Sequence, residues 1–598
     1  MSDDFTPDQK RYLEGFVSGM QSTRTARGLA PLGSGAGSAA SVPAGPDREH
    51  LEAQARTVAK GGKLAEQEKW KAAEHPFDAY ARFKAQAESG TYPKPDDNFR
   101  WRYQGLFYVA PAQNSYMCRL RIPNGILTHW QFAGVADLAE HLGGGYAHVT
   151  TRANLQVRDI QAQNAPAFIE GLSDLGLTAK GSGADNIRNV TGSATAGIDP
   201  RELLDTRPHA RAWHHHILND RSLYGLPRKF NVAFDGAGSI ATLEDTNDIG
   251  FQAIEVVEGA SFEGEPVRPG VWYRLALGGI TGHRDLARDT GVVVAPSDAV
   301  AVADAVIRVF TANGNRSDRN KARLKYVLDD WGFDRFLVAV EEKLGRRLVR
   351  VGATFVAPRP AYDRLAHIGV HAQAQAGLNW IGVALPVGKL TVAQMRVIAA
   401  IARHSGDGDI RLTVWQNLLI SGVPDASVDD VLANLEAIGL SAEASLLRAG
   451  LIACTGATGC KFAAAHTKED ALAIAAHCEP QIVLDQPVNI HLTGCHNSCA
   501  QHYIGDIGLI GARVPVGEEG DTVEGYDLYV GGGYGVDGGI ARAFREKIKA
   551  EEAPAVVKSI LDAWQMHRAT PDESFVAFAR RHDMEALTVL AARTEAAA

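Results

Sequence analysis

The pattern of hydrophobic and polar positions near the N-terminus is helical. Apolar residues recur at helical spacing over residues 7–26, and two further stretches near 47–72 and 76–89 show the same period. Residues 28–46 are rich in Gly, Ala, Ser and Pro, a composition that buries little surface and is typical of a flexible linker. We therefore predict an N-terminal helical extension over residues 1–95.

From about residue 100 the chain repeats itself. The segment IPNGILTHWQ (122–131) matches LPVGKLTVAQ (385–394) at an offset of 263 residues (385 minus 122), and HVTTRANLQV (148–157) resembles IRLTVWQNLL (410–419). Each copy changes from the alternation of a strand to the period of an amphipathic helix and back. Two such copies predict an α/β fold of the α+β type, internally duplicated, with two similar halves packed about a pseudo-twofold axis.

Composition and charge point to no unusual class of protein. The chain has 598 residues, of which 45 % are hydrophobic and 22 % charged, as in an ordinary globular protein with several domains. The net charge of −9 favours neither a nucleic acid nor a membrane partner. We find no secretory h-region and no apolar run of about 18 residues. The few cysteines suit a reducing cytosol, so we predict a cytoplasmic protein.

Four of the six cysteines form two closely spaced pairs. Cys454 and Cys460 are separated by five residues, and Cys495 and Cys499 by three. Four thiolates that converge from two loops are what a [4Fe–4S] cluster requires, and small residues around them let backbone N–H groups approach the sulfides. A zinc site and unconnected buried thiols are the alternatives, although zinc favours C-x2-4-C pairs and a five-residue gap fits it poorly.

The cysteine motifs CTGATGC and TGCHNSC resemble those of the siroheme-containing nitrite and sulfite reductases. The resemblance covers roughly residues 100–590 and is closest to the assimilatory ferredoxin-dependent nitrite reductases. It implies that Cys454, Cys460, Cys495 and Cys499 hold a [4Fe–4S] cluster. It also implies that Cys499 bridges to the iron of a siroheme.

The same resemblance implies a siroheme-reductase fold and divides the chain into parts. The N-terminal extension at 1–95 precedes two ferredoxin-like repeats, at 96–178 and 356–440. The first siroheme-binding half, with the substrate cations, is expected at 179–355. The second half, with the cysteines and C-terminal helices, is expected at 441–598.

Arginines and a lysine gather in the first part of this region, and a carboxylated tetrapyrrole and a small oxyanion both need cations. Arg119 and Arg121 lie two apart on a probable strand, so both are expected on one face. The resemblance implies that one of these two, with Arg188 and Lys229, surrounds the substrate and that Arg152 holds siroheme carboxylates. For any one of them alone, a solvated position or a surface salt bridge is the ordinary alternative.

Two more cations, Arg323 and Lys325, lie in RNKARLKYVLDDWG (319–332), which resembles another family motif. They contact siroheme carboxylates or lie on a solvated helix face. In the duplication, Arg188 aligns near the segment that contains Cys454. One copy thus carries cations where the other carries cluster ligands, and we expect the two copies to enclose one site.

The residue at position 231 bears on the choice between nitrite and sulfite as the substrate. Sulfite reductases that this chain resembles carry a second lysine here (K-x-K), whereas nitrite reductases carry asparagine (K-x-N), as this chain does with Lys229 and Asn231. Nitrite is a monoanion and sulfite is largely a dianion near neutral pH. Replacing a cation by a neutral donor removes a charge-assisted bond of about 1.5–3 kcal/mol, a preference on the order of ten- to a hundredfold.

A glycine-rich segment imitates a nucleotide site. Residues 526–548 predict a strand, then Gly533-x-Gly535-x-x-Gly538, then a helix, which fits a dinucleotide fingerprint. Only about 50 residues follow, too few for the second half of a Rossmann sheet. We prefer a turn close to the metal centre, as in siroheme reductases.

These observations predict the assimilatory six-electron reduction of nitrite to ammonium by a monomer that receives electrons from an external carrier such as ferredoxin. Reduction of sulfite to sulfide by the same machinery is the closest alternative. A precorrin-modifying relative and a non-catalytic iron–sulfur protein are less favoured, because they leave the full length or the cations unexplained. The expected substrate residues are Arg119, Arg121, Arg188, Lys229 and Asn231.

Overall fold

The computed structural model describes residues 44–517 and 520–597, together with a few positions between 6 and 23. The few described positions inside the predicted helix over residues 7–26 are helical, whereas the rest of that stretch and nearly all of the predicted linker at 28–46 lie outside the described residues. In the described part of the chain, no helix combines the length and hydropathy that a membrane span needs.

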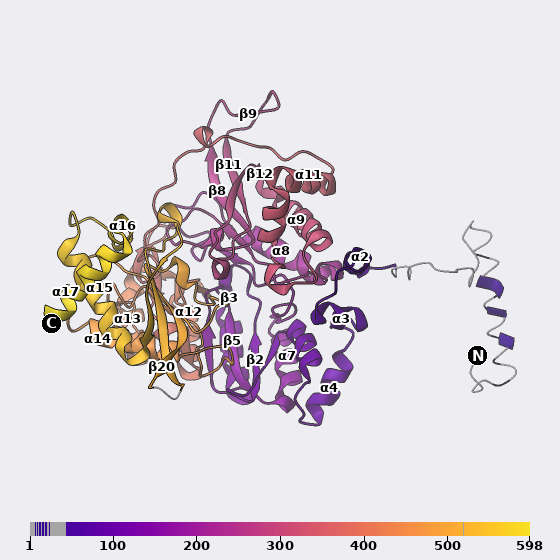
Figure 1. The fold of residues 1–598 in the computed structure, drawn as a ribbon, viewed down its shortest axis with the longest axis horizontal. Coiled ribbons are helices and arrows are strands. Elements are labelled where there is room, and N and C mark those ends of the chain that lie inside the picture. Colours follow the sequence, from indigo (N-terminus) through magenta and orange to yellow (C-terminus); the bar gives the residue numbers. More distant parts are fainter. Residues whose placement is uncertain are drawn as a thin grey trace.

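Four helices form the described part of the N-terminal extension. The stretch near 47–72 is broken at Gly61, which follows α2 with a φ of +80°. Figure 1 shows these helices in indigo and purple along one side of the molecule, where α2 packs on α9 and α4 on α7. Their bounds are α2 (Arg48–Ala59), α3 (Glu66–Ala73), α4 (Tyr80–Glu88) and α5 (Pro95–Trp101).

Two five-stranded sheets come from the ferredoxin-like repeats, in the orders β1-β2-β5-β4-β15 and β13-β14-β17-β16-β3. The first contains β1 (Leu106–Val109), β2 (Ser115–Arg119), β4 (Tyr146–Val149), β5 (Leu155–Ile160) and β15 (Lys389–Thr391). The second contains β13 (Gly369–Ala372), β14 (Leu378–Val383), β16 (Asp409–Leu412), β17 (Leu418–Pro424) and β3 (Ile126–Thr128). Their helices are α6 (His129–Leu142), α7 (Ala165–Asp174), α12 (Val392–Ser405) and α13 (Val428–Ala437).

The two repeats exchange one strand. β3 follows β2 along the chain but pairs with β16, and β15 pairs in return with β4. Each exchanged strand leads into a helix that begins with the same capping box, Thr128 with Gln131 in α6 and Thr391 with Gln394 in α12. The two helices pack together, so the repeats share one hydrophobic core.

Two larger sheets form the parts that we call the first half and the second half, in the orders β6-β7-β8-β11-β12 and β18-β19-β20-β21-β22. In each sheet the first three strands are parallel to one another, and each of the last two pairs antiparallel with the strand before it. The first half has β6 (Thr191–Gly192), β7 (Val232–Asp235), β8 (Ile249–Val256), β11 (Gly270–Leu277) and β12 (Arg288–Val294), with a small hairpin of β9 (Ser261–Phe262) and β10 (Glu265–Pro266). The second half has β18 (Leu451–Ala453), β19 (Ile490–Thr493), β20 (Ile507–Val516), β21 (Asp521–Val530) and β22 (Arg542–Lys549).

Helices cover both of these sheets, and each half has its own hydrophobic core. The first half has α8 (Arg207–Asn219), α9 (Ala299–Asn313), α10 (Leu324–Trp331) and α11 (Phe333–Leu344). The second half has α14 (Thr467–Cys478), α15 (Ala553–His567), α16 (Phe575–Arg581) and α17 (Met584–Ala597).

The strand registers align the two halves residue by residue. Val232 pairs with Ile249 between β7 and β8, and Ile490 pairs with Ile507 between β19 and β20. Because 490 minus 232 and 507 minus 249 both equal 258, the loops after β7 and β19 have the same length. The predicted duplicated fold of mixed helices and sheets is therefore confirmed, whereas the five-part division of the chain stays a prediction.

Candidate functional site

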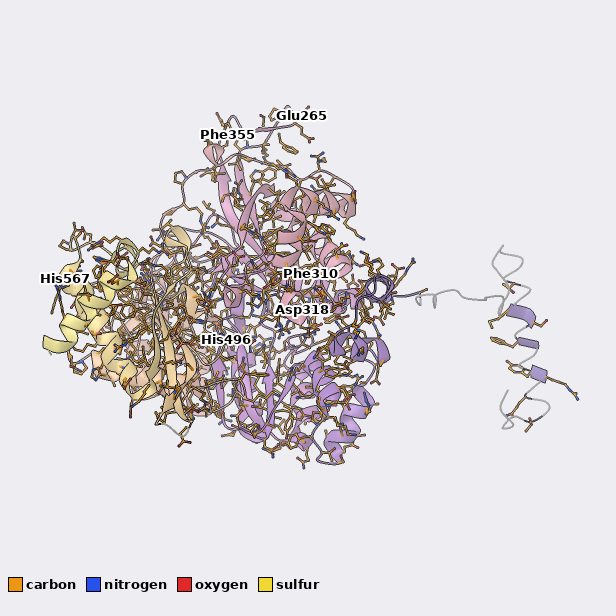
Figure 2. All side chains as sticks on the ribbon, in the orientation of Figure 1. Glu265, Phe310, Asp318, Phe355, His496 and His567 are labelled. Carbon is orange, nitrogen blue, oxygen red and sulfur yellow. The ribbon has the colours of Figure 1, made fainter. Side chains whose placement is uncertain are left out.

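The two cysteine pairs lie in loops at one edge of the second-half sheet. Cys454 follows β18, and Cys495 follows β19, and the carboxyl ends of these parallel neighbours meet at the same edge. Electrostatic interactions link Cys499 to Cys454 and Cys495, and Cys495 to Cys460, so the four thiols form one group. Figure 2 shows the neighbouring His496 between the orange and purple parts of the ribbon.

The surroundings of these thiols suit a metal cluster. Burial raises the pKa of Cys495 to about 11 and also raises the pKa of Cys454, and the nearby thiols add to both shifts. Because metal ligands must be thiolates, binding a cluster replaces the protons that these crowded groups otherwise hold. The backbone N–H of Gly494 donates to Sγ of Cys454 at 3.2 Å, and Nδ2 of Asn497 donates to Sγ of Cys495 at 3.5 Å. Such N–H···S contacts stabilise thiolate ligands.

Two buried cations flank the loop that follows Cys454. Arg158 of β5 donates to the carbonyl oxygen of Gly459 at 3.1 Å and to Oγ1 of Thr455 at 2.7 Å. Lys468 of α14 interacts electrostatically with Cys454. Sequence reasoning missed Arg158, for which the polar alternation along β5 was the available signal.

Arg119 and Lys229 lie near Cys499 without a hydrogen-bond or ion-pair partner in the described part of the chain. Each interacts electrostatically with the Cys499 thiol. No residue in the described ranges forms a hydrogen bond or an ion pair with either cation, and the Arg119 guanidinium lies 4.8 Å from the centre of the Phe107 ring. Burial, together with the charge of Arg323, lowers the pKa of Lys229 to about 7. Unpaired cations beside the exposed Cys499 are what an anion site requires.

Arg152 and Arg188 complete this group. Arg152 donates to Oδ1 of Asn247 at 2.7 Å, and Arg188 donates to two carbonyl oxygens at 2.6 and 2.7 Å. Each keeps a buried Nε that has no hydrogen-bond partner among the described residues. Burial lowers the pKa of Arg152 to about 10 and lowers that of Arg188 as well. The structure thus brings together four of the predicted cations: Arg119, Arg152, Arg188 and Lys229.

Arg121 does not join the group. β2 ends at Arg119, so the strand alternation does not extend to Arg121. The Arg121 side chain is buried, donates to the carbonyl oxygen of Ile187 at 2.7 Å and lies near His214. The expectation that both arginines share one face is therefore wrong, and Arg119 is the one beside Cys499.

Arg323 and Lys325 are held in internal ion pairs. The buried Arg323 guanidinium contacts both carboxylate oxygens of Asp248, at 2.6 and 3.1 Å. Lys325 pairs with Asp285 at 2.5 Å and with Asp329 at 3.0 Å. A solvated helix face is thus wrong for Arg323, and both cations already have carboxylate partners.

Asn231 lies directly before β7 and two residues after Lys229. Its backbone N–H donates to Oδ2 of Asp248 at 2.8 Å. The residue is only 8 % exposed, and its side-chain amide makes no hydrogen bond with any residue that the structure describes. Neither residue belongs to a strand, so a shared direction of the Asn231 and Lys229 side chains stays a prediction.

Two further arginines share one buried carboxylate near Lys229. Arg319 contacts both carboxylate oxygens of the buried Asp185, at 2.7 and 2.8 Å, and Arg228 lies 4.0 Å from the same carboxylate. Burial and the charge of Arg319 lower the pKa of Arg228 to about 10. Sequence reasoning selected neither, although Arg228 adjoins Lys229. Nothing in the sequence pairs Asp185 with a residue 134 positions later.

Comparison with known proteins places this arrangement in a family. The model "Nitrite and sulphite reductase 4Fe-4S domain" matches residues 183–348 and 448–585. The model "Nitrite/Sulfite reductase ferredoxin-like half domain" matches residues 110–175 and 371–438. The chain belongs to the nitrite and sulfite reductase family. It is an oxidoreductase, and the predicted cofactors, siroheme and a [4Fe–4S] cluster, are those of this family.

Several relatives cover most of the chain. A ferredoxin–nitrite reductase of Leptolyngbya laminosa is 37 % identical over 476 residues, which are 78 % of this chain and 90 % of that protein. One of Synechococcus elongatus is 34 % identical over 474 residues, 78 % of this chain and 89 % of that protein. The solved structure of Mycobacterium tuberculosis NirA protein has a TM-score of 0.81 at 29 % identity and covers 89 % of this chain and 99 % of that one.

The residues of this site fit both cofactors of the nitrite and sulfite reductase family. The four grouped thiols with their N–H donors suit a [4Fe–4S] cluster. The buried Nε atoms of Arg152 and Arg188, which lack partners in the described part of the chain, suit the carboxylates of a siroheme. When bound, the siroheme supplies an iron at which an oxyanion is reduced.

The glycine-rich segment is no nucleotide site in this member of the family. β21 is followed by a turn and then by β22, which pairs antiparallel with β21, so the helix predicted after Gly538 is wrong. A Cβ at Gly532 would lie 2.3 Å from the carbonyl oxygen of Gly505, which shows that this turn packs against the loop that follows Cys499. Its position close to the metal centre stays a prediction.

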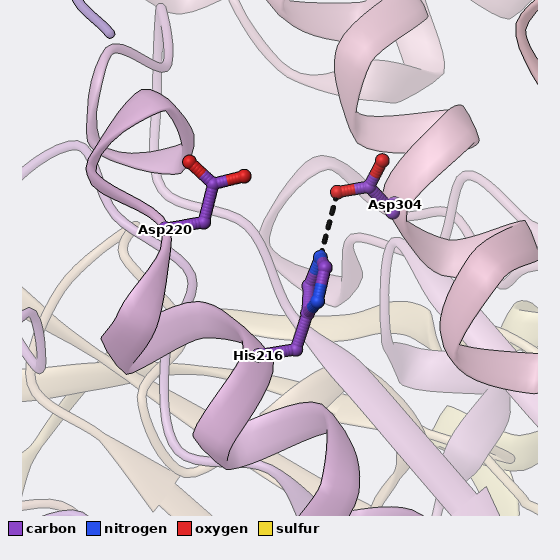
Figure 3. Close-up of side chains that lie close together, drawn as sticks. All are labelled: His216, Asp220 and Asp304. Atoms are coloured by element: carbon purple, nitrogen blue, oxygen red, sulfur yellow. Dashed lines mark hydrogen bonds and ion pairs between the residues drawn. The ribbon is translucent and has the colours of Figure 1, made fainter.

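A second group of ligand-type side chains lies elsewhere (Figure 3). The ligand atoms of His216, Asp220 and Asp304 lie within 4.8 Å of one another. Arg308 donates to Asp304 at 2.6 Å and to Asp220 at 2.7 Å, and Nε2 of His216 lies 2.8 Å from Asp304. The carboxylates are already paired with a guanidinium, so this group is an ion-pair network between α8 and α9.

Proposed function

We propose that the chain catalyses the assimilatory six-electron reduction of nitrite to ammonium with electrons from a ferredoxin. The relatives from Leptolyngbya laminosa and Synechococcus elongatus are named ferredoxin–nitrite reductase. A relative from Haloferax mediterranei, 30 % identical over 534 residues, is named assimilatory ferredoxin-dependent nitrite reductase. These names support nitrite as the substrate and ferredoxin as the donor.

The observation that carries the proposal is the position of Arg119 and Lys229 beside Cys499. With no ion-pair partner among the described residues, both can bind nitrite oxygens through charge-assisted hydrogen bonds. Because the pKa of Lys229 is lowered to about 7, its ammonium can release and regain a proton near neutral pH. That property suits a reaction in which the oxygens leave as water.

We assign the other predicted residues to the support of this site. Arg152, Arg188 and Cys499 hold the siroheme, and Cys454, Cys460, Cys495 and Cys499 hold the cluster. Arg323 acts through Asp248, since the same carboxylate accepts the backbone N–H of Asn231 and the Arg323 guanidinium. We assign Arg121 no substrate contact, because its guanidinium donates to the carbonyl oxygen of Ile187. A contact of Lys325 with a siroheme carboxylate stays a prediction, since its ammonium pairs with Asp285.

Sulfite reduction is the second candidate, because the matched family includes sulfite reductases. Asn231 argues against it. A neutral amide at this place leaves Lys229 as the one cation of the Lys-x-Asn pair, which suits a monoanion better than a dianion. The cytoplasmic location and the monomeric state stay predictions.

The stoichiometry of the reaction tests the proposal. Purified enzyme loaded with both cofactors is supplied with nitrite and a reduced viologen, and nitrite, ammonium and oxidised viologen are measured together. We expect one ammonium per nitrite and six oxidised viologens. Nitrite consumption without ammonium, or sulfide formation from sulfite at a much higher kcat/KM, contradicts the proposal.

A further inference from the structure

The segment that carries Lys229 is anchored by a helix of the N-terminal extension. Lys71 of α3 is buried, and its Nζ donates to the carbonyl oxygen of Leu226 at 2.7 Å. Arg316, also buried, donates to the carbonyl oxygen of Gly225 at 2.9 Å. Two cations thus hold adjacent carbonyl groups, three and four residues before Lys229 (229 minus 226 and 229 minus 225).

One carboxylate of α3 holds both of these cations. Oε1 of Glu68 lies 2.5 Å from Nζ of Lys71, and Oε2 lies 2.6 Å from the Arg316 guanidinium. The Glu68 side chain is 1 % exposed, and Nε2 of Gln54 on α2 donates to it at 2.8 Å. Burial alone raises the pKa of a carboxyl group, but Lys71 and Arg316 lower the pKa of Glu68 below its usual value.

A second buried carboxylate continues the network to the site. Asp185 is fully buried and lies 3.6 Å from Nζ of Lys71. The same carboxylate contacts Arg319 at 2.7 Å and lies 4.0 Å from Arg228, the neighbour of Lys229. The chain of charges therefore runs without a break from α3 to the residue before Lys229.

The other end of the segment is fixed independently. The backbone N–H of Phe230 donates to the carbonyl oxygen of Asn186 at 3.0 Å, and the N–H of Arg188 donates to the carbonyl oxygen of Phe230 at 2.8 Å. Lys229 therefore lies between two anchors. One belongs to the first half itself and the other depends on α3. Figure 1 shows α3 at the edge of the molecule beside the first half, so the second anchor comes from outside the sheet that carries the site.

We propose that α3 is a positioning element of the substrate site and that Lys71 and Glu68 set the placement of Lys229. The inference rests on the proposed function in one respect, that Lys229 binds the oxyanion. Removing one partner of a buried ion pair leaves the other charge uncompensated, which strongly destabilises the surrounding structure. Loss of the Lys71 ammonium therefore releases the Leu226 carbonyl and loosens the segment from Gly225 to Lys229.

The test compares three variants of α3 in the fully loaded enzyme. Lys71→Met removes the charge and the hydrogen bonds, Lys71→Gln keeps a donor without the charge, and Lys69→Met is the matched control, because Lys69 lies on the same helix in an exposed pair with Glu66. The readouts are the nitrite Kd from optical titration, hydrogen exchange of the peptide that covers residues 225–231, and Tm. We expect the Kd to rise about tenfold in Lys71→Met, less in Lys71→Gln, and not at all in Lys69→Met.

Faster exchange of the 225–231 peptide should accompany the weaker binding. A lower Tm with unchanged Kd and unchanged exchange in this peptide shows that α3 only stabilises the fold, and overturns the inference. If Lys71→Met does not fold, an unchanged Kd in Lys71→Gln overturns it. Lys229→Met separates the two claims. Unchanged nitrite binding in that variant defeats the proposed role of Lys229, whereas weaker binding there with normal binding in both Lys71 variants defeats only the inference about α3.

Discussion

The two halves of the molecule build the same loop and place different chemistry on it. In each half an aspartate at the end of the loop accepts the backbone N–H of the residue directly before the strand that precedes the loop. Oδ2 of Asp248 accepts from Asn231 at 2.8 Å, and Oδ2 of Asp506 accepts from Asn489 at 2.9 Å. Both aspartates are buried, so this shared frame is part of the interior of each half.

Each aspartate also has one arginine partner, but the two arginines come from different places in the chain. Arg323, directly before α10, lies 2.6 Å from Asp248, and Arg364, in the segment before β13, lies 2.7 Å from Asp506. A buried carboxylate needs a partner, and the duplicated frame finds one separately in each half. The carboxylate is thus the retained feature, and the cation that neutralises it is not.

Positions to which we assign the chemistry hold different side chains in the two halves. By the offset of 258, the first half has a lysine where the second half has a proline, and two alanines where the second half has cysteines. The pairs are Lys229 and Pro487, Ala237 and Cys495, and Ala241 and Cys499. Because the frame is stabilised by backbone and aspartate contacts, these positions can change without loss of the loop.

The ferredoxin-like repeats show the same division. Oγ1 of Thr151 in the first repeat donates to the carbonyl oxygen of Cys499 at 2.8 Å, and Nε1 of Trp415 in the second repeat donates to that of Ala241 at 3.1 Å. By the offset of 263, Trp415 corresponds to Arg152. Trp415 is 3 % exposed and fills with an apolar ring the place that Arg152 supplies with a cation. Only one of the two related places is therefore suited to an anion.

The largest expected effect comes from replacing Cys499, a cysteine of the second half that corresponds to an alanine in the first half. Cys499→Ser should lower activity by about a hundredfold or more and change the absorption of both the siroheme and the cluster, because the proposed shared thiolate is lost. The matched variant is Ala241→Ser at the equivalent position of the first half, which should keep both spectra. A normal spectrum and a normal rate in Cys499→Ser contradict the assignment.

Replacement of Arg323 or of Arg364 should lower stability by a similar amount, but only the replacement of Arg323 should weaken nitrite binding. Arg323→Met and Arg364→Met each leave a buried aspartate unpaired, which lowers the free energy of unfolding by about 3–5 kcal/mol. Urea unfolding measures this loss. Arg323→Met should in addition weaken nitrite binding, since Asp248 holds the Asn231 backbone. Equal nitrite affinity in the two variants argues against that link.

Replacement of Lys229 in the first half should change the kinetics of nitrite reduction, whereas replacement of the equivalent Pro487 in the second half should not. Lys229→Met should lower kcat/KM for nitrite about a hundredfold, through loss of a charge-assisted hydrogen bond in the transition state. Pro487→Met, at the equivalent position, should leave steady-state kinetics unchanged, although loss of the proline ring costs up to about 1 kcal/mol of stability through the unfolded chain. If both variants behave alike in the kinetic assay, the division between the halves does not extend to substrate binding.

Buried histidines should make the stability of both halves depend on pH in a similar way. This effect should be smaller than those of the substitutions above. Burial lowers the pKa of His214 in the first half to about 3 and that of His491 in the second half to about 4. In the unfolded chain these histidines bind a proton near pH 6.5, whereas in the folded protein they stay neutral to a much lower pH. The free energy of unfolding is therefore highest above about pH 6.5 and falls below it, by up to about 1.4 kcal/mol per pH unit for each histidine. Urea unfolding at about pH 7 and about pH 5 checks this. His214→Gln and His491→Gln should each reduce the difference, and an unchanged difference contradicts the account.

Much of this comparison could be predicted from the sequence, because local patterns encode it. The cysteine spacing predicted one thiol group, and the matching segments near Pro123 and Pro386 predicted the duplication. The exchange of β3 and β15 could not be predicted, since alternation predicts a strand but not its partner. The separation of Arg119 from Arg121 depends on where β2 ends, and strand ends are poorly specified by pattern. The role of Arg158 could not be predicted either, because its hydrogen bond to the carbonyl oxygen of Gly459 joins residues that are 301 positions apart in the chain.

The most direct test of the central claim compares kcat/KM for nitrite and for sulfite in the purified enzyme, with a reduced viologen as the donor. We predict a clear preference for nitrite, on the order of ten- to a hundredfold from the charge at position 231. We also predict that Asn231→Lys reduces the difference in kcat/KM between nitrite and sulfite. A preference for sulfite in the unaltered enzyme would leave the fold and cofactors in place, but it would contradict the claim that one neutral side chain beside Lys229 selects the monoanion.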